Sequence, residues 1–457
     1  MKKLYWVLPR VLFIVCTLAT PCSEEPKTQR ESRLDIISYG IETELISLVE
    51  ALEKEDNKEF TPELTALFSS TRSVGVRESI LTLFSNQAVD TLKDWTESLL
   101  QDPWEERSST VILALSYASK LSLKECAPSV RALLETENTQ FRGPAIAALG
   151  KIGGTEDAAF LSDMLDDEIS GDEKQRLVTR QAIMTALAEL KDPSQWDRFL
   201  EIAENEDENG VIRATAAKAL AAIGGDRAYD ALAKIYESTD PVLREAALSG
   251  AAKLEGRGAE TLISDGLRDS YYKVRIQALA SAKEKKLDGI TPLVLYRAKT
   301  DPVESVRDAA YETLAVLGNK EGLDWLSSLV NDEKATDARR VKAAKALSQY
   351  QKDIAWSVIP TVARKALSDD KKTWLRYELG KIVASAADSR YADLALEYLS
   401  HKDTLTRSLG LDMYEKQRYA SVKSRIETIA EDDKQGALQK RAKTILEKDR
   451  SIPPASE

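Results

Sequence analysis

The chain is 457 residues long and carries 64 Lys and Arg against 75 Asp and Glu, a formal net charge of −11 at pH 7. Nucleic acid and anionic lipid surfaces are therefore poor partners, because both are bound mainly by neutralising phosphates. One histidine and three cysteines are too few for a His-ligated zinc site or an ordinary catalytic triad, and 43% hydrophobic residues argue against a disordered chain.

The first 23 residues have the pattern of a secretory signal. Lys2, Lys3 and Arg10 make the segment basic, and an apolar run follows at 11–19. This run is too short to span a bilayer comfortably, since a span takes roughly 20 apolar residues. We expect residues 1–23 to direct export, with an uncleaved anchor or a buried helix as the alternatives.

Two processing sites are compatible with this segment. Cys22 lies where a bacterial lipoprotein carries its acylated cysteine, and the polar residues 24–40 behind it would form a flexible tether. The preceding Ala19-Thr20-Pro21 departs from the usual lipobox, so cleavage after Ala19 is the alternative. Acylation of Cys22 would attach only the N-terminus to a membrane. The protein is thus expected to be exported, either periplasmic or a membrane-anchored lipoprotein.

From about residue 60 onward the chain repeats itself roughly every 33 residues. An arginine, called the register arginine below, marks each copy. The eleven are Arg77, Arg107, Arg142, Arg180, Arg213, Arg244, Arg275, Arg307, Arg340, Arg376 and Arg407. Internal repetition of this kind is typical of a solenoid.

Each copy has the pattern of a helical hairpin. After Arg213, the small or apolar residues Ala216, Ala217 and Leu220 share one helical face. The residue before the arginine is usually apolar too, as in Val76, Phe141, Ile212, Leu243, Val274, Val306 and Leu375. Another amphipathic stretch precedes each such helix. Asp-Pro pairs (102–103, 240–241, 301–302) mark helix starts, and glycine-containing pairs (153–154, 224–225, 318–319) mark helix ends. No strand pattern occurs, so the fold is expected to be all-α.

The fullest copy, Asp301 to Gly318, reads Asp-Pro-x-x-x-Val-Arg-x-x-Ala-x-x-x-Leu-x-x-Leu-Gly. It resembles the HEAT repeat family, in particular the short bacterial variety also found in phycobilisome-lyase-like proteins. The resemblance covers roughly residues 60–415 and implies an α-solenoid, a right-handed superhelix of about eleven helical hairpins. Terminal helices at 41–55 and 420–447 would cover the ends of the core. The solenoid is therefore expected over 41–447, with a disordered tail at 448–457.

The row of register arginines has a functional and a structural interpretation. Its clearest members are Arg142, Arg213, Arg244, Arg275, Arg307 and Arg340. The row could bind an acidic partner, whereas the family resemblance implies that Arg307 pairs with Asp301 or with the equivalent acid of an adjacent copy. The pairs Asp240 with Arg244 and Asp269 with Arg275 repeat that arrangement. Because every copy contains the arginine and every copy must stack, we interpret the row as structural.

Four aromatic residues are the candidate partner-binding rim: Trp104, Tyr271, Tyr272 and Trp374. They lie shortly before their register arginines, in the turn between paired helices. Turns at equivalent places share one rim of a solenoid, and exposed aromatic residues are favoured binding anchors. The alternative is that each ring covers a local apolar gap. Four further tryptophans lie inside first helices and are expected in the core: Trp95, Trp196, Trp325 and Trp356.

Other candidate chemistry is weak. The acidic loops at 205–210 and 166–171 imitate the first half of an EF-hand, but the twelfth position holds Ala216 or Leu177 in place of a bidentate glutamate. No phosphate-binding glycine motif or nucleophile elbow is present. Cys126 is expected to be a plain buried thiol, and His401 a surface residue.

These features predict a protein that is not an enzyme, with no cofactor and no catalytic or metal site. We expect an exported scaffold or adaptor that mediates protein–protein interaction in the bacterial cell envelope, through the inner face of the second helices and the aromatic rim. The resemblance to phycobilisome-lyase-like repeats admits a different function: an enzyme or enzyme subunit acting on a protein-bound cofactor. DNA binding would need a basic groove that so acidic a chain is unsuited to build.

Overall fold

A computed structural model describes residues 28–166 and 172–451. Within those ranges the chain is all-α and contains no strand, as the sequence predicts. The predicted signal, including Cys22 and Ala19, lies outside the described residues. No helix in the described ranges is long and apolar enough to cross a membrane.

The helices alternate between the first and the second helix of a hairpin. The first helices are α1 (Gln29–Tyr39), α3 (Thr61–Ser70), α5 (Lys93–Gln101), α7 (Ala127–Glu135), α9 (Thr155–Asp166), α11 (Trp196–Glu204), α13 (Asp226–Tyr236), α15 (Arg257–Gly266), α17 (Thr291–Thr300), α19 (Lys320–Asn331), α21 (Lys352–Ser368), α23 (Ala392–Leu399) and α25 (Lys423–Glu431). The second helices are α2 (Glu42–Lys54), α4 (Val74–Gln87), α6 (Ser108–Leu121), α8 (Arg142–Ile152), α10 (Glu173–Leu190), α12 (Gly210–Ile223), α14 (Pro241–Ala251), α16 (Tyr272–Lys285), α18 (Glu304–Leu317), α20 (Asp337–Tyr350), α22 (Thr373–Ala386), α24 (Thr404–Gln417) and α26 (Ala437–Ser451). Short 3-10 helices lie in the connections, at Lys124–Cys126, Pro193–Gln195, Asp288–Ile290, Asp370–Lys372, Ser389–Tyr391, Ala420–Val422 and Asp433–Gln435.

The eleven register arginines begin or lie in the second helices α4 to α24, one per hairpin, with Arg107 as the residue that caps the start of α6. Two further hairpins, α1–α2 and α25–α26, flank them in the described chain. The eleven hairpins predicted from the register arginines are therefore present in the described chain. The terminal helices predicted at 41–55 and 420–447 each belong to a complete hairpin of their own.

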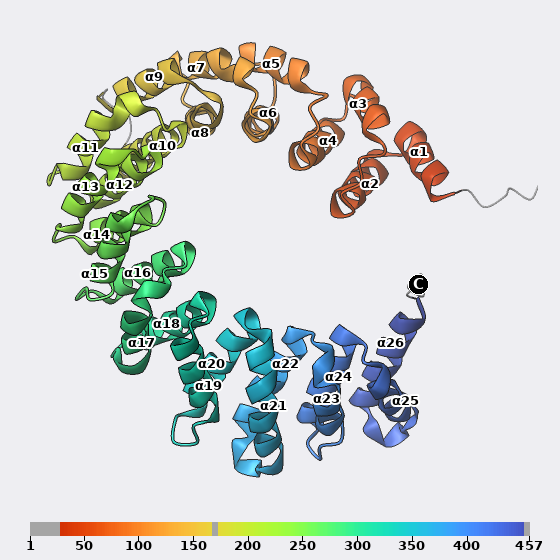
Figure 1. Ribbon diagram of the computed structural model, residues 1–457. Coiled ribbons are helices and arrows are strands. Elements are labelled where there is room, and N and C mark those ends of the chain that lie inside the picture. The colour runs from red at the N-terminus through yellow and green to blue at the C-terminus, as the bar shows by residue number, and fades with distance from the viewer. Residues whose placement is uncertain (1–27, 167–171, 452–457) are drawn as a thin grey trace, which may run out of the picture. The chain divides into compact units, whose positions relative to one another are not determined.

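The chain divides into two compact units, 1–153 and 154–457. Within each unit the second helices pack directly on one another, and each first helix packs against the second helix of its own hairpin. Figure 1 shows this as two rows in each unit, with the even-numbered helices in the inner row and the odd-numbered helices in the outer row.

The core follows from the repeat pattern. In α12, Ile212, Ala216 and Leu220 are fully buried, whereas Val211 and Lys218 on the same helix are exposed. The apolar residue before each register arginine is likewise buried, from Val76, Phe141 and Ile212 through Leu243, Val274, Val306 and Leu375. Alanine on the buried face lets neighbouring helices approach closely, and the row of second helices forms the continuous core of each unit.

Helix α1 contradicts the predicted flexible tether over 24–40, since 29–39 are helical. Thr28 accepts a hydrogen bond from the backbone N–H of Glu31, and the Glu31 carboxylate accepts one from the backbone of Thr28, which together cap the helix start. Arg30 then reaches Glu59, with 2.6 Å between Nε and Oε1, and Arg33 reaches Glu55 at 2.7 Å. These contacts with residues more than 20 positions away order a polar segment whose local sequence shows little amphipathic pattern.

The C-terminal boundary also differs, because α26 extends to Ser451 and includes residues 448–451 of the predicted tail. Tyr414 and Arg418 of α24 both contact the carboxylate of Asp449. That anchor holds the last turn of α26 to the hairpin before it.

Helix boundaries confirm the turn signals only in part. Asp240 caps α14, accepting a hydrogen bond from the N–H of Val242, and Pro241 is the first helical residue. Asp301 does not cap a helix in this way. It lies three residues before α18, and its carboxylate pairs with Arg275 of the preceding hairpin. At helix ends, Gly318 has the expected left-handed conformation with φ of 69°, whereas Gly153 is extended. Six second helices end instead on a left-handed residue other than glycine: Ala88, Ser122, Lys191, Lys286, Ala387 and Arg418.

Candidate binding surface

Six of the register arginines contact backbone carbonyls of their own hairpin. Arg275 Nη1 donates to the carbonyl oxygens of Asp269 at 2.9 Å and Ser270 at 3.1 Å, in the turn before its own helix. Arg244 and Arg307 make the same pair of contacts in their hairpins. Arg213, Arg340 and Arg376 instead reach a carbonyl ten residues earlier, near the end of the first helix. The guanidinium thereby supplies donors to carbonyls that a helix terminus leaves without partners.

Several of the same arginines also join one hairpin to the next. Arg244 forms a two-pronged ion pair with Asp269, with Nε–Oδ2 and Nη2–Oδ1 distances of 2.8 and 2.9 Å. Arg275 pairs with Asp301 in the same way, at 2.8 Å for both contacts. Further links of this kind join Arg180 with Glu208 and, at 3.9 Å each, Arg77 with Glu106 and Arg376 with Asp403. Their contacts agree with a structural role for the row.

The structure resolves which acid each arginine takes. Arg244 and Arg275 each pair with the acid of the following hairpin. The sequence spacing suggested an ion pair with the acid of the same hairpin instead, and neither arginine forms it. Arg307 contacts Asp301 only through the backbone carbonyl, at 2.7 Å, because the Asp301 carboxylate is already held by Arg275. The Asp301 carboxylate is therefore not the partner of Arg307, whereas the other implied arrangement, pairing with the equivalent acid of an adjacent copy, is the one that Arg244 and Arg275 adopt.

Three other members of the predicted row are also at least partly buried. The side chain of Arg340 is 4% exposed and pairs with Asp337, one helical turn earlier, at 3.2 Å. Arg213 donates to the carbonyl oxygen of Ala203 at 3.1 Å. Arg142 begins α8 and is half-buried. A row that binds an acidic partner would need exposed arginines, and none of these three is exposed.

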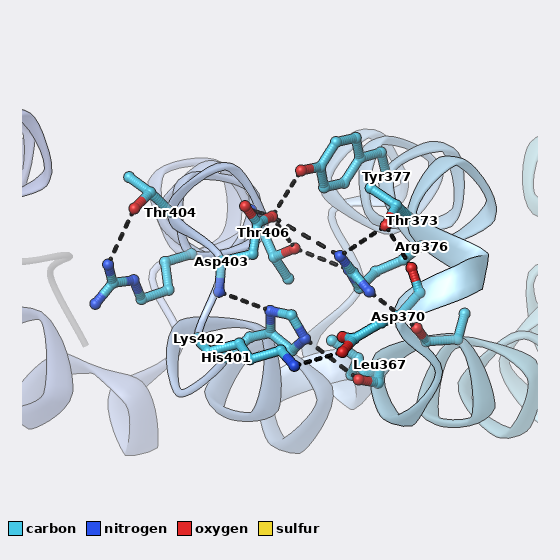
Figure 2. A network of polar contacts seen from close by, with 12 residues as sticks. Leu367, Asp370, Thr373, Arg376, Tyr377, His401, Lys402, Asp403, Thr404 and Thr406 are labelled. Atoms are coloured by element: carbon cyan, nitrogen blue, oxygen red, sulfur yellow. Dashed lines mark hydrogen bonds and ion pairs between the residues drawn. The ribbon is translucent and has the colours of Figure 1, made fainter.

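The most connected polar cluster surrounds the buried Arg376 (Figure 2). Its Nε donates to the hydroxyl oxygen of Thr406 at 2.9 Å, and that hydroxyl donates in turn to the Asp403 carboxylate at 2.7 Å. Tyr377 also donates to Asp403, at 2.7 Å. Burial alone would raise the pKa of Asp403, but the hydrogen bonds from Tyr377 and Thr406 outweigh it and lower the pKa to about 2.

His401, predicted as a surface residue, belongs to the same cluster and is only partly exposed (Figure 2). Its Nδ1 accepts from the N–H of Asp403 at 3.0 Å, and its Nε2 lies 3.2 Å from the carbonyl oxygen of Leu367 in the preceding hairpin. Burial, followed by the nearby positive charge of Arg376, lowers the pKa of the imidazole. The neutral imidazole therefore connects the start of α24 to the last turn of α21.

The four predicted rim aromatics are all at or near the start of a second helix, but they do not form one continuous row. Trp104 is 44% exposed in the connection before α6, with its ring centroid 5.9 Å from that of Phe141. Tyr272, the first residue of α16, is exposed, whereas Tyr271 is half-buried against it, with ring centroids 5.3 Å apart. Trp374, the second residue of α22, is 50% exposed and lies three hairpins further along the chain.

Of the tryptophans predicted in the core, Trp196 is buried, Trp95 and Trp325 are half-buried, and Trp356 is exposed. Trp356 differs because Ala355 and Ile359 take the buried face of α21 and turn its ring outward. Arg390 of the following hairpin lies over that ring, 5.4 Å from the centroid.

A set of exposed apolar side chains occurs at one position of the repeat, two residues before the register arginine. We call it the apolar column; its members are Val178, Val211, Val242, Trp374 and Leu405. The first three occur on the consecutive second helices α10, α12 and α14, and each is at least 44% exposed. Of these residues only Trp374 was predicted to bind a partner, because the repeat pattern was described by the buried residue next to the arginine. The signal was present one position earlier.

Chemically reactive groups are scarce in the described residues. Cys126 is buried, as predicted; burial, assisted by Glu125 and Glu97, raises the pKa of its thiol to about 11. No group of three His, Cys, Asp or Glu side chains in those ranges is arranged to hold a metal ion. In the loop before α12, Asn205 accepts from the backbone N–H of Asp207, which is an ordinary turn contact.

A protein-family model described as "Spirochaete HEAT repeat protein" matches residues 37–445, which is most of the chain. No curated protein matches.

Among solved structures, Kap121p aligns with a TM-score of 0.44 and 13% identity, over 92% of this chain and 53% of that chain. Kap121p bound to RanGTP aligns with a TM-score of 0.41 and 14% identity, over 93% of this chain and 50% of the other. Human deoxyhypusine hydroxylase in complex with glycerol aligns with a TM-score of 0.27 and 16% identity, over 66% and 99% of the two chains. The chain thus spans about half the length of Kap121p.

Proposed function

Because the chain belongs to the spirochaete HEAT repeat family, we propose that it is a scaffold or adaptor that binds other proteins and acts after export, in the cell envelope. The proposal comprises two parts, protein binding and export, which rest on different residues and are tested separately.

The apolar column is the observation that carries the protein-binding part. Stacking of the hairpins is served by the buried faces and by the register arginines, so the exposed valines at 178, 211 and 242 contribute nothing to it. Exposed apolar groups that recur on adjacent elements are typical of interaction surfaces. On the next second helix, α16, the exposed Tyr272 lies one position earlier in the repeat, three residues before its register arginine.

Photo-crosslinking in intact cells tests this part. The photoreactive residue p-benzoylphenylalanine is placed at Val211 or Val242, and at Tyr296 as a matched control on the outer helix α17, where the native ring is 55% exposed. A discrete protein adduct at the two valine positions but not at Tyr296 is the expected result. No adduct at the column, or the same adducts at all three positions, would refute the proposed role of the column.

The export part rests on the sequence of residues 1–23. We expect the mature protein to begin at Thr20 or at Cys22, which mass spectrometry of the purified protein distinguishes from a chain that retains Met1. Labelling with a radioactive fatty acid separates the two cases, because only Cys22 acylation is lost in Cys22→Ser. An intact N-terminus in the cytoplasmic fraction would contradict export.

The sequence also admitted an enzyme or enzyme subunit acting on a protein-bound cofactor, and that reading remains a prediction. Copurification of a pigment or another small molecule in stoichiometric amount would support it.

A further inference from the structure

A groove of 540 Å³ lies between the second helices α20 and α22. Its apolar lining includes Val341 of α20 together with Ile382 and Ala386 of α22. A volume of this size is within the range of ordinary ligand sites in proteins. The groove can therefore accept one side chain and the adjoining backbone of a bound segment.

Three lysines line the same groove: Lys345 on α20, Lys352 at the start of α21 and Lys381 on α22. All three lysines are exposed, and Glu378 is the one acidic residue that lines the groove with them. Lys381 pairs with Glu378 at 2.7 Å. No ion pair of Lys345 or Lys352 occurs among the described residues, and three lysines against one glutamate give the groove an excess of positive charge.

Neighbouring lysines of the same row are neutralised, which sets the groove apart. Lys342 pairs with Asp308 of α18 at 2.6 Å, and Lys283 pairs with Glu312 at 3.4 Å. On the other side, the α24 carboxylates Asp412 and Glu415 are paired with Arg441 and Lys448 of α26. A positive groove between neighbours whose charges are balanced favours a short anionic segment over a long polyanion or an extended anionic membrane surface, because only the groove offers an excess of positive charge.

We infer that this groove binds a short acidic peptide segment of a partner protein, with one apolar side chain against Val341 and Ile382 and flanking carboxylates on Lys345, Lys352 and Lys381. The inference rests on the proposed protein-binding function and adds the chemistry of the partner. Charged pairs at such a surface mainly set specificity and the rate of association, and the apolar contact holds the segment in register.

Fluorescence anisotropy with the full-length protein tests the inference. The probe is a fluorescein-labelled peptide, Gly-Asp-Glu-Asp-Leu-Glu-Asp-Glu-Gly, titrated at about 0.05 and 0.15 M salt because charge contacts weaken with ionic strength. We expect saturable binding that weakens at higher salt. Replacing the central Leu of the peptide by Gly should reduce affinity severalfold, and replacing its acids by Lys should abolish binding.

The variants are Lys345→Glu and Lys381→Glu, alone and combined. The matched control is Lys218→Glu, which makes the same charge change at the equivalent position of α12, five residues after its register arginine. We expect the combined variant to lose at least 10-fold in affinity and the control less than twofold. No saturable binding by the parent, or equal losses in the groove variants and the control, would overturn the inference. Stronger lysine-dependent binding to phosphatidylglycerol vesicles than to the peptide would overturn it as well.

This result is independent of crosslinking at the apolar column. If the peptide fails while Val211 crosslinks a protein, the groove assignment falls and the proposed function stands. If the peptide binds through the groove while the column yields no adduct, the role assigned to the column falls and the groove remains a peptide site.

Discussion

Arg275 of α16 holds Asp301, which precedes α18 in the next hairpin, in a two-pronged ion pair with both contacts at 2.8 Å. The two side chains are 7% and 0% exposed. The Asp301 carboxylate also accepts a hydrogen bond from the N–H of Val303 at 3.0 Å, so both of its oxygens have hydrogen-bond donors. A buried pair with such partners is costly to break from one side, because the remaining charge stays buried and unpaired.

Asp301→Ala should therefore lower the free energy of unfolding by about 3–5 kcal/mol. Urea unfolding followed by circular dichroism measures the change. Asp324→Ala is the control, since it removes an ion pair with Lys320 in which both partners are largely exposed, and it should cost less than about 1 kcal/mol. Equal losses in the two variants would show that the buried pair contributes no more than a surface contact.

Stability should decrease with acidification in a window set by Asp403. Its pKa is about 2 in the folded chain, below the value of about 3.9 expected when unfolded. The unfolded state thus binds the proton first, and the stabilisation present above about pH 4 is lost progressively as the pH falls toward 2. Burial by itself would also raise the pKa values of Asp269 and Asp301, but their arginine pairs lower them, which adds to the same trend.

Asp403→Asn should flatten this pH dependence while lowering stability at pH 7. Urea midpoints at pH 6, 4, 3 and 2.5 for the parent and the variant provide the comparison. Identical pH profiles would exclude Asp403 as a contributor.

Glycine allows close helix packing at several positions of unit 2, and Gly250 is one of them. A Cβ on Gly250 of α14 would lie 2.8 Å from the Cβ of Ala221 and 3.0 Å from Leu232 Cδ1, closer than carbon atoms approach. Gly250→Ala should destabilise the protein by about 1–3 kcal/mol although alanine is the better helix former.

Gly143 in α8 provides the matched control, because a Cβ there has no atom within 4 Å. Gly143→Ala should be neutral or stabilising by up to about 1 kcal/mol. Thermal unfolding of both variants measures the contrast, and a stabilising Gly250→Ala would contradict the close approach of α14 to α12 and α13.

Cys126 should be unreactive in the folded protein at neutral pH, since burial raises the pKa of its thiol to about 11 and blocks access. In protein carrying Cys16→Ser and Cys22→Ser, a disulfide thiol reagent should modify Cys126 only after urea unfolding. Rapid modification at pH 7 without denaturant would place the thiol at the surface.

The repeating part of the fold is predictable because stacking imposes the same demand on every hairpin. A register arginine, the buried residue before it and small residues after it recur at fixed spacing, and these positions define α4 to α24. Helix α1 is not predictable in this way. Only Ile37 of that helix is buried, and its order comes from Glu55 and Glu59, which local pattern reasoning does not connect to it.

The binding surface was harder to predict than the core. Sequence spacing places two acids within reach of each register arginine, and only the geometry shows that Arg244 and Arg275 select the acid of the following hairpin. Trp356 has the residue type and helical location of a core residue, but one step of about 100° along the helix puts its ring outside. The lysine groove joins residues from three helices, so no single stretch of sequence reveals it.

The central claim is that the exposed side of the second helices binds a protein, and the dissociation constant of the crosslinked partner tests it most directly. Once that partner is identified and purified, its affinity is measured for the parent and for Val211→Glu combined with Val242→Glu, with Tyr296→Glu as the control on the outer row. We predict a loss of at least 10-fold, which corresponds to about 1.4 kcal/mol, for the column variant and unchanged affinity for the control. Unchanged affinity in the column variant would contradict the claim.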